Sequence, residues 1–247
     1  MKFQFNVMLL SLVLLTISGC SDDDDNIILD SPVNETVTEN ESGNDSSLLS
    51  FTVKLDNLTQ SQPLSPFAFV VADSSYQAWN LGDAASVALE VLAEGGDNSQ
   101  LTEAALEQGF IIDSMEAPIG SGQSNSIILD ISENTPAYLT AVSMLVNTND
   151  AFTGITAFNL MNLTIDESIR LYLPIYDAGT EANSELAGTI PGPADAGVGF
   201  DVARDDLDRV TRHPGIVSQD DGHSESVLKE YHRFLGNAAM ITIERTQ

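Results

Sequence analysis

Alternating apolar and polar residues predict short β-strands along most of the chain after the first fifty residues. In residues 49–55, Phe51, Val53 and Leu55 alternate with Thr52 and Lys54, the period of two expected of a strand with one buried face. Residues 67–72 are almost continuously apolar, which predicts a strand that is buried on both faces. Further strand-like runs, separated by Asn, Asp, Thr, Gly or Pro, occupy residues 126–131, 137–146, 154–160, 169–175 and 239–244.

Two segments have helical spacing instead. Residues 84–93 are followed by Gly95-Gly96 and residues 101–108 by Gly109, and glycine commonly terminates a helix. Many short strands with two early helices predict a mainly β fold, namely an antiparallel β-sandwich with short helical insertions. Residues 179–222 are rich in Gly, Pro and Asp, which predicts a long loop region that is functional or held by a ligand.

The first residues have the pattern of an export signal. Lys2 precedes an apolar run at residues 7–17, and Ile17-Ser18-Gly19-Cys20 forms a lipobox. The run is too short to span a bilayer stably, since a span needs roughly 20 apolar residues. We therefore predict a lipoprotein signal peptide at residues 1–19 and lipidation of Cys20, the single cysteine, as a membrane anchor.

The composition then divides the rest of the chain. Residues 20–50 are acidic and polar, so they are expected to form a disordered, flexible linker. Residues 51–247 are long enough for one domain with a substantial core. Together with the lipobox, this organisation predicts a protein of the bacterial cell envelope, held by lipid in the outer membrane or at the cell surface.

The net charge of -28 narrows the choice of partners. No Lys or Arg occurs between Lys54 and Arg170. Such a surface repels phosphates, so nucleic acid is excluded as a partner. Two explanations for the many acidic residues remain: they form a solvated surface, or they bind cations.

Two oxygen-rich segments follow strand-like runs and predict the two halves of a calcium site. Asp150 follows the first run, and Asp177 and Glu181 follow the second. Calcium takes six to eight oxygen ligands, which neighbouring side chains or loop carbonyls could complete: Thr148, Asn149 and Asn183. The regular EF-hand loop is absent, and turns in which Asp and Asn bind their own backbone are the alternative.

An ordered set of motifs resembles the spondin N-terminal domain family, over nearly all of residues 51–247. The motifs are Asn57-Leu58-Thr59, Gln62-Pro63-Leu64-Ser65-Pro66, Gly95-Gly96-Asp97, Ala117-Pro118, Ser143-Met144-Leu145, Asn149-Asp150, Tyr176-Asp177-Ala178-Gly179-Thr180-Glu181, Ile190-Pro191-Gly192-Pro193 and His213-Pro214-Gly215-Ile216. The resemblance implies an antiparallel β-sandwich, similar to calcium-dependent membrane-binding modules, with a calcium ion bound by acidic loop residues. By motif match, those residues are Asp150, Asp177 and Glu181.

The sequence departs from this family at one ligand position. Animal members usually have a second aspartate where this chain has Glu181. Their cysteines and thrombospondin-type repeats have no counterpart here, so their matrix and neuronal roles do not transfer.

These observations predict a non-catalytic calcium-binding module that presents an adhesion surface to an unknown extracellular or periplasmic ligand. The alternative is a calcium-dependent envelope hydrolase with paired carboxylates as acid and base. The wide spacing of His213, His223 and His232 disfavours a zinc site. A second cation at Asp205, Asp206 and Asp208 is conceivable, but a solvated loop is favoured there.

Overall fold

The computed structural model describes residues 48–247, and their fold is mainly β. The strands are β1 (Leu48–Asn57), β2 (Ala68–Ala72), β3 (Ile111–Ser114), β4 (Ser124–Ser132), β5 (Tyr138–Met144), β6 (Ala151–Asn159), β7 (Ser168–Asp177), β8 (Thr211–Arg212) and β9 (Asn237–Arg245). The helices are α1 (Val87–Gly95) and α2 (Ser99–Glu107), with three short 3₁₀ helices, η1 (Leu160–Asn162), η2 (Gln219–Asp221) and η3 (Glu230–His232). The predicted mainly β fold with two short helices is confirmed.

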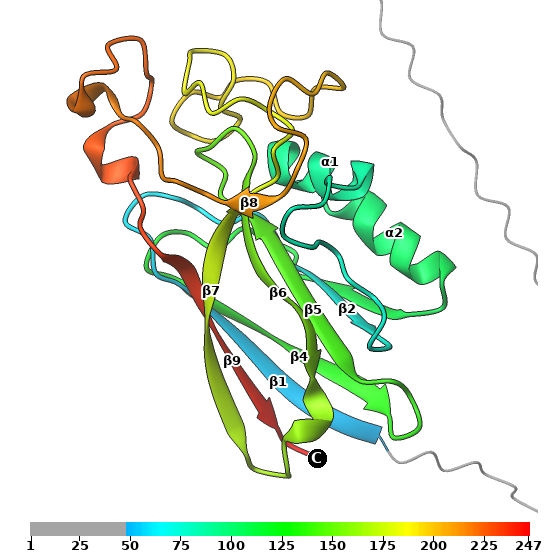
Figure 1. Cartoon of the computed structure of the whole chain (residues 1–247). Helices are drawn as coiled ribbons and strands as arrows, with labels where there is room; N and C mark the ends of the chain where they lie inside the picture. The colour runs from blue at the N-terminus through cyan, green and yellow to red at the C-terminus, as the bar shows by residue number, and fades with distance from the viewer. Residues whose placement is uncertain (1–47) are drawn as a thin grey trace, which may run out of the picture. The chain divides into compact units, whose positions relative to one another are not determined.

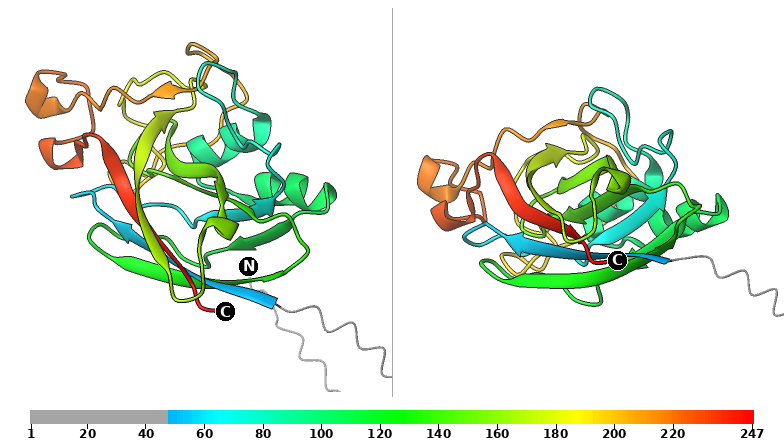
Figure 2. Two further views of the ribbon diagram at one scale, coloured as in Figure 1. Left: turned by 60° about the horizontal axis from the view of Figure 1, so that its bottom comes forward. Right: turned by 90° about the horizontal axis from the view of Figure 1, so that it is seen from below.

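The strands form one antiparallel sheet that nearly closes into a barrel (Figures 1 and 2), rather than the two separate sheets of the predicted sandwich. The strand order is β3-β2-β5-β6-β7-β9-β1-β4, and β8 pairs with β7 off this path. Strand β7 joins the two halves because it changes partner along its length. Its first part pairs with β9, and its last three residues pair with β6. The register shifts between Leu173 and Pro174, where proline lacks the N–H that a regular ladder needs.

The buried side chains explain the apolar runs of the sequence. Strand β2 is buried at all five positions because it is covered on both faces. Phe69 and Val71 belong to the core enclosed by the sheet. Ala68 and Val70 belong to a second cluster with Leu89 of α1, so the helices cover the outer face of this half of the sheet.

Helix α1 begins later than its apolar pattern predicts. The Ser86 hydroxyl accepts a hydrogen bond from the Leu89 N–H and caps the helix. At the other end Gly96 has a φ of 71°, the left-handed conformation that favours glycine. Strands β3 and β8 were not predicted, since runs of four and two residues are too short to show a period.

Strand β1 begins at Leu48, slightly before the predicted domain boundary. The signal peptide, Cys20 and residues 21–47 lie outside the described residues. Among the residues that are described, no helix is long and apolar enough to cross a membrane.

The loops that matter for the candidate site gather at one end of the sheet, beside β8 and α1 (Figure 1). They are the β5–β6 connection and the chain that follows β7. Residues 178–210 contain no regular element, in agreement with the predicted loop region, although β8 and η2 lie within its later part.

Candidate calcium site

The pairing of β6 with β7 brings the two predicted halves of the site together. Ala151 at the start of β6 lies opposite Asp177 at the end of β7. Asp150 therefore lies beside Asp177, and the Ala178 N–H donates to the Asp150 carbonyl at 3.3 Å. A turn before β6 holds Asp150 in place, since the Thr148 hydroxyl accepts from the Ala151 N–H at 3.1 Å.

Asp150 is fully buried, and only one of its two carboxylate oxygens has hydrogen-bond partners. Its Oδ2 accepts from the Thr180 N–H at 2.8 Å and from the Glu181 N–H at 3.3 Å. Its Oδ1 has no hydrogen-bond partner. A buried carboxylate oxygen without a partner is costly, so this atom needs a proton or a cation.

Asp177 lies at the strand end with 4% of its surface exposed. Its Oδ1 accepts from the Gly179 N–H at 2.8 Å, and its Oδ2 accepts from the Asn183 amide at 2.6 Å. The other side of the Asn183 amide contacts the His213 ring at 3.0 Å. These bonds fix the Asp177 carboxylate in the loop that follows β7.

Glu181 contributes to the site mainly through its backbone. Its N–H donates to Asp150, but its carboxylate accepts from the Asn149 amide at 2.8 Å and leaves Oε2 without a partner. The charge that most affects Glu181 is that of Glu94, in α1. The Glu181 carboxylate thus belongs to a second acidic group beside the Asp150–Asp177 pair.

Metal coordination would therefore need oxygens beyond acidic side chains. Within residues 48–247, no three acidic, histidine or cysteine side chains converge as ligands of one ion. Thr148 and Asn149, considered above as extra ligands, instead make hydrogen bonds that hold the loops. Calcium accepts backbone carbonyls and water as ligands, so Asp150 and Asp177 with such oxygens suit this ion.

Sequence reasoning missed part of the acidic environment. Burial raises the pKa of Asp206, treated above as part of a solvated loop, and the nearby Asp177 charge raises this pKa further. The neighbouring Asp205 accepts from the Ala182 N–H at 2.8 Å. Glu94 was not singled out at all, although a glutamate just before Gly95-Gly96, at the negative end of a helix, is unfavourable there and is a signal.

Burial dominates the electrostatics of the site. It raises the pKa of Asp150 to about 7, with a further contribution from the Asp177 charge. Burial also raises the pKa of Asp177 and that of Glu181, the latter to about 7. Raised carboxyl pKa values show that the site lacks positive charge, which a cation would supply.

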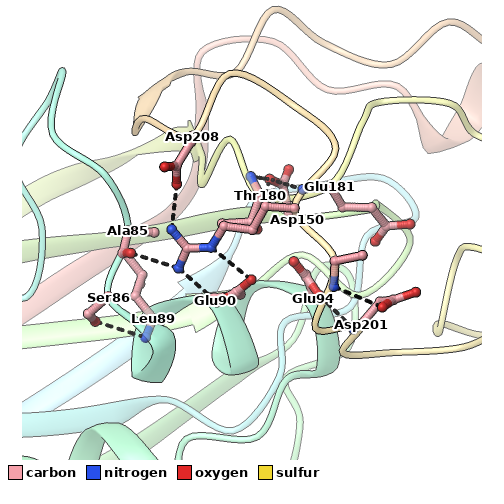
Figure 3. A network of polar contacts seen from close by, with 12 residues as sticks. Ala85, Ser86, Leu89, Glu90, Glu94, Asp150, Thr180, Glu181, Asp201 and Asp208 are labelled. Carbon is pink, nitrogen blue, oxygen red and sulfur yellow. Dashed lines mark hydrogen bonds and ion pairs between the residues drawn. The ribbon is translucent and has the colours of Figure 1, made fainter.

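Glu90 and Asp208, which lie near the site (Figure 3), take the ion pairs of the arginine at position 204, so this arginine does not pair with Asp150, Asp177 or Glu181. Arg204 holds Glu90 of α1 through two hydrogen bonds, at 3.0 and 2.7 Å, and donates to the Ala85 carbonyl at 2.9 Å. It also pairs with Asp208. Arg204 therefore ties the loop to α1 while the acids of the site stay unpaired.

The fold and site define a β-sheet domain whose loops at one end form a buried acidic cluster. The family described as Spondin_N matches residues 59–189, more than half of the chain. The protein belongs to this spondin N-terminal domain family. A comparison with curated proteins gives no match.

The matched range contains Asp150, Asp177 and Glu181 but ends before Asp205 and Asp206. It also ends before the Ile190-Pro191-Gly192-Pro193 and His213-Pro214-Gly215-Ile216 motifs. Domains of this family are generally non-catalytic binding modules, which favours a binding role over the hydrolase alternative.

The raised carboxyl pKa values predict how stability depends on pH without metal. Because unfolded carboxyls titrate near pH 4, the folded chain binds more protons up to about pH 7, and stability falls as the pH rises through the folded pKa values of Asp150 and Glu181. Burial lowers the pKa of His213 to about 4. This shift makes stability rise with pH instead, but most of that rise lies below the unfolded histidine pKa of about 6.5.

We therefore expect the chelator-treated protein to lose about 1 kcal/mol of unfolding free energy between pH 6.5 and pH 8. Urea unfolding at the two pH values measures this loss. Asp150→Asn should flatten the dependence, and a gain in stability over this interval would contradict it.

Proposed function

We propose that this protein is a lipid-anchored, calcium-binding module of the bacterial cell envelope that presents a non-catalytic adhesion or ligand-binding surface. The observation that carries the calcium assignment is the fully buried Asp150, whose Oδ1 has no partner beside Asp177. In this proposal Asp150 and Asp177 hold the ion, the Glu181 carboxylate exchanges its Asn149 hydrogen bond for the ion and becomes the third carboxylate ligand, and loop carbonyls or water complete the shell.

Calcium would have a structural role in this module. Bound at the ends of β6 and β7, it would neutralise the charges that these loops bury and fix their backbone. It would thereby hold the neighbouring segment 198–207, which carries exposed apolar side chains. Val198, Val202 and Leu207 are 63%, 84% and 62% exposed. Exposed apolar side chains commonly mark interaction sites. In this proposal the ion fixes the loops that carry them, so that they form a binding surface for a ligand outside the membrane.

The anchor and the location rest on the sequence. The lipobox at Cys20 predicts lipidation, and an acylated protein with two or more chains stays on the membrane. Fractionation of cells that express Cys20→Ser tests this part, since the variant should leave the membrane fraction; its retention there would contradict the anchor.

Calcium should stabilise the folded chain measurably. An ion that binds only the folded state adds about 2.7 kcal/mol at a hundredfold excess over its Kd. For a domain of this size, that corresponds to a rise in Tm of roughly 5–11 °C. Differential scanning calorimetry in calcium and in excess chelator measures the difference, and identical Tm values would contradict the proposal.

Two variants that each remove one negative charge distinguish a specific calcium site from a general effect of charge. Asp177→Asn should abolish most of the calcium-dependent rise. Asp130→Asn removes the same charge from an exposed position of β4 and should leave the rise unchanged. Asp206 is unsuitable as a control because it interacts with Asp177.

A further inference from the structure

A hollow opens beside η3, on the side of the loop end that lies away from α1 and α2 (Figures 1 and 2). Its volume is about 530 Å³, within the range of pockets that hold small ligands. The proposed calcium site uses none of the residues that line it. Most of these residues are polar, and none is Asp or Glu; they include Gln60, Ser61, Ser121, Lys229, Tyr231 and His232.

Buried hydrogen bonds fix the walls of this hollow. The Asn147 side chain is almost fully buried, and it donates to the Ser61 carbonyl at 2.8 Å and accepts from the Ala194 N–H at 2.9 Å. The Gln62 amide is also buried, and it donates to the Asn147 carbonyl at 3.1 Å and to the His232 carbonyl at 2.8 Å. Segments that are distant in sequence are thus tied together around the hollow, so its shape is formed before a ligand binds.

His232 provides a buried polar side chain with one nitrogen left for a ligand. The residue is only 7% exposed. Its Nδ1 accepts from the Lys229 N–H at 3.0 Å, so in the neutral ring the proton is on Nε2. Burial lowers the pKa of His232, which favours this neutral form. Within residues 48–247, Nε2 reaches the surface without a hydrogen-bond partner, and it is therefore a donor available in the hollow.

Tyr231 supplies a flat apolar surface in the same hollow. This residue is 48% exposed. The His232 ring packs edge-on against the Tyr231 ring, with the ring centroids 4.4 Å apart and the planes at 64°. A tyrosine ring offers a large contact area at a low cost in conformational entropy. The hollow thus combines one aromatic surface with several polar groups.

Charge narrows the class of ligand. Among the described residues that line the hollow, Lys229 is the only charged one, and its ammonium donates to the Gln219 amide oxygen rather than to a carboxylate. Such a lining disfavours a cationic ligand. The net charge of -28 disfavours a polyanion, and the polar lining disfavours a wholly apolar ligand. A neutral ligand with many hydroxyl groups and a flat apolar face meets all three conditions.

We propose that this hollow binds a neutral oligosaccharide. One face of a sugar ring consists of C–H groups and packs on Tyr231, while the hydroxyls around its rim accept from Lys229 and from the His232 Nε2–H. The inference takes from the proposed function only that the domain is a binding module, and it involves no calcium ligand.

A neighbouring hollow explains why the ligand is a chain of sugars rather than a single one. This second hollow has a volume of about 290 Å³ and shares Gln60 and Tyr231 with the first. Asp220 and Glu230 also line it, and their carboxylates accept hydrogen bonds from sugar hydroxyls. The same two carboxylates repel an anionic sugar. An oligosaccharide can therefore continue from one hollow into the next across the Tyr231 ring.

Saturation-transfer NMR of the purified full chain tests this inference with neutral tetrasaccharides: cellotetraose, maltotetraose, mannotetraose and N-acetylchitotetraose. We expect at least one of them to bind, with the strongest saturation on ring C–H protons. Tyr231→Ala should weaken this binding about tenfold, and Gln60→Ala, in an exposed loop, should weaken it as well. Tyr172→Ala changes a tyrosine of β7 that is 61% exposed and should leave binding unchanged.

Tetragalacturonate and tetralysine serve as charged comparisons. If none of the neutral tetrasaccharides binds, in calcium or in chelator, the inference is wrong. Tighter binding of a charged probe would also overturn it, as would binding that is unchanged in both Tyr231→Ala and Gln60→Ala. The proposed function fails on a different measurement, the calcium-dependent rise in Tm, so the two proposals can fail separately.

Discussion

Replacing Arg204 with leucine is expected to lower the unfolding free energy by about 3 kcal/mol, because it leaves the Glu90 carboxylate buried without its partner. Glu90 is only 3% exposed, and Arg204 binds both of its oxygens. The same side chain also satisfies the Ala85 carbonyl. For a domain of this size the Tm should fall on the order of 10 °C, measurable by calorimetry in chelator so that metal binding does not contribute.

A double variant distinguishes the lost ion pair from lost packing. When Glu90→Leu accompanies Arg204→Leu, no charge stays buried at this position, so most of the lost stability should return. Arg170→Leu changes an exposed arginine of β7 and should alter stability by no more than about 0.5 kcal/mol. If the double variant is less stable than Arg204→Leu alone, the buried charge is not the cause.

The Arg204–Glu90 pair also shows what the sequence could not predict. The two residues are 114 positions apart, and nothing in their local patterns links them. The strands of regular alternation were predictable because each half-buried strand repeats every two residues. The change of partner along β7 was not, because the contribution of Pro174 depends on which strand lies next to it.

The site shows the same division between local and distant information. Asp150 and Asp177 each follow an apolar strand, so their position at a sheet end was predictable, and the β6–β7 register then places them side by side. The direction of the Glu181 side chain was not predictable, because it depends on Asn149 and on Glu94 of α1. The packing of segment 199–201 on the end of α1 likewise requires the tertiary fold.

Gly179→Ala is expected to destabilise the protein by about 3 kcal/mol, through strain and a steric clash together. Gly179 has a φ of 70°, and the left-handed conformation costs an alanine roughly 1–2 kcal/mol. An added Cβ would lie 2.3 Å from the Arg209 carbonyl oxygen, and relieving such overpacking typically costs a further 1–3 kcal/mol. Urea unfolding of the variant and the natural protein in chelator measures the loss.

The clash matters for the site because Gly179 joins its two acidic loops. Its carbonyl accepts from the Asp208 N–H at 2.7 Å, and its own N–H donates to Asp177 at 2.8 Å. Gly122 has the same φ of 70° with no atom within 4 Å of an added Cβ, so Gly122→Ala measures the strain alone. Equal losses in the two variants would show that the close approach to Arg209 does not constrain the loop. A larger loss in Gly179→Ala, accompanied by weaker calcium binding, would show that contact between the loops positions Asp177.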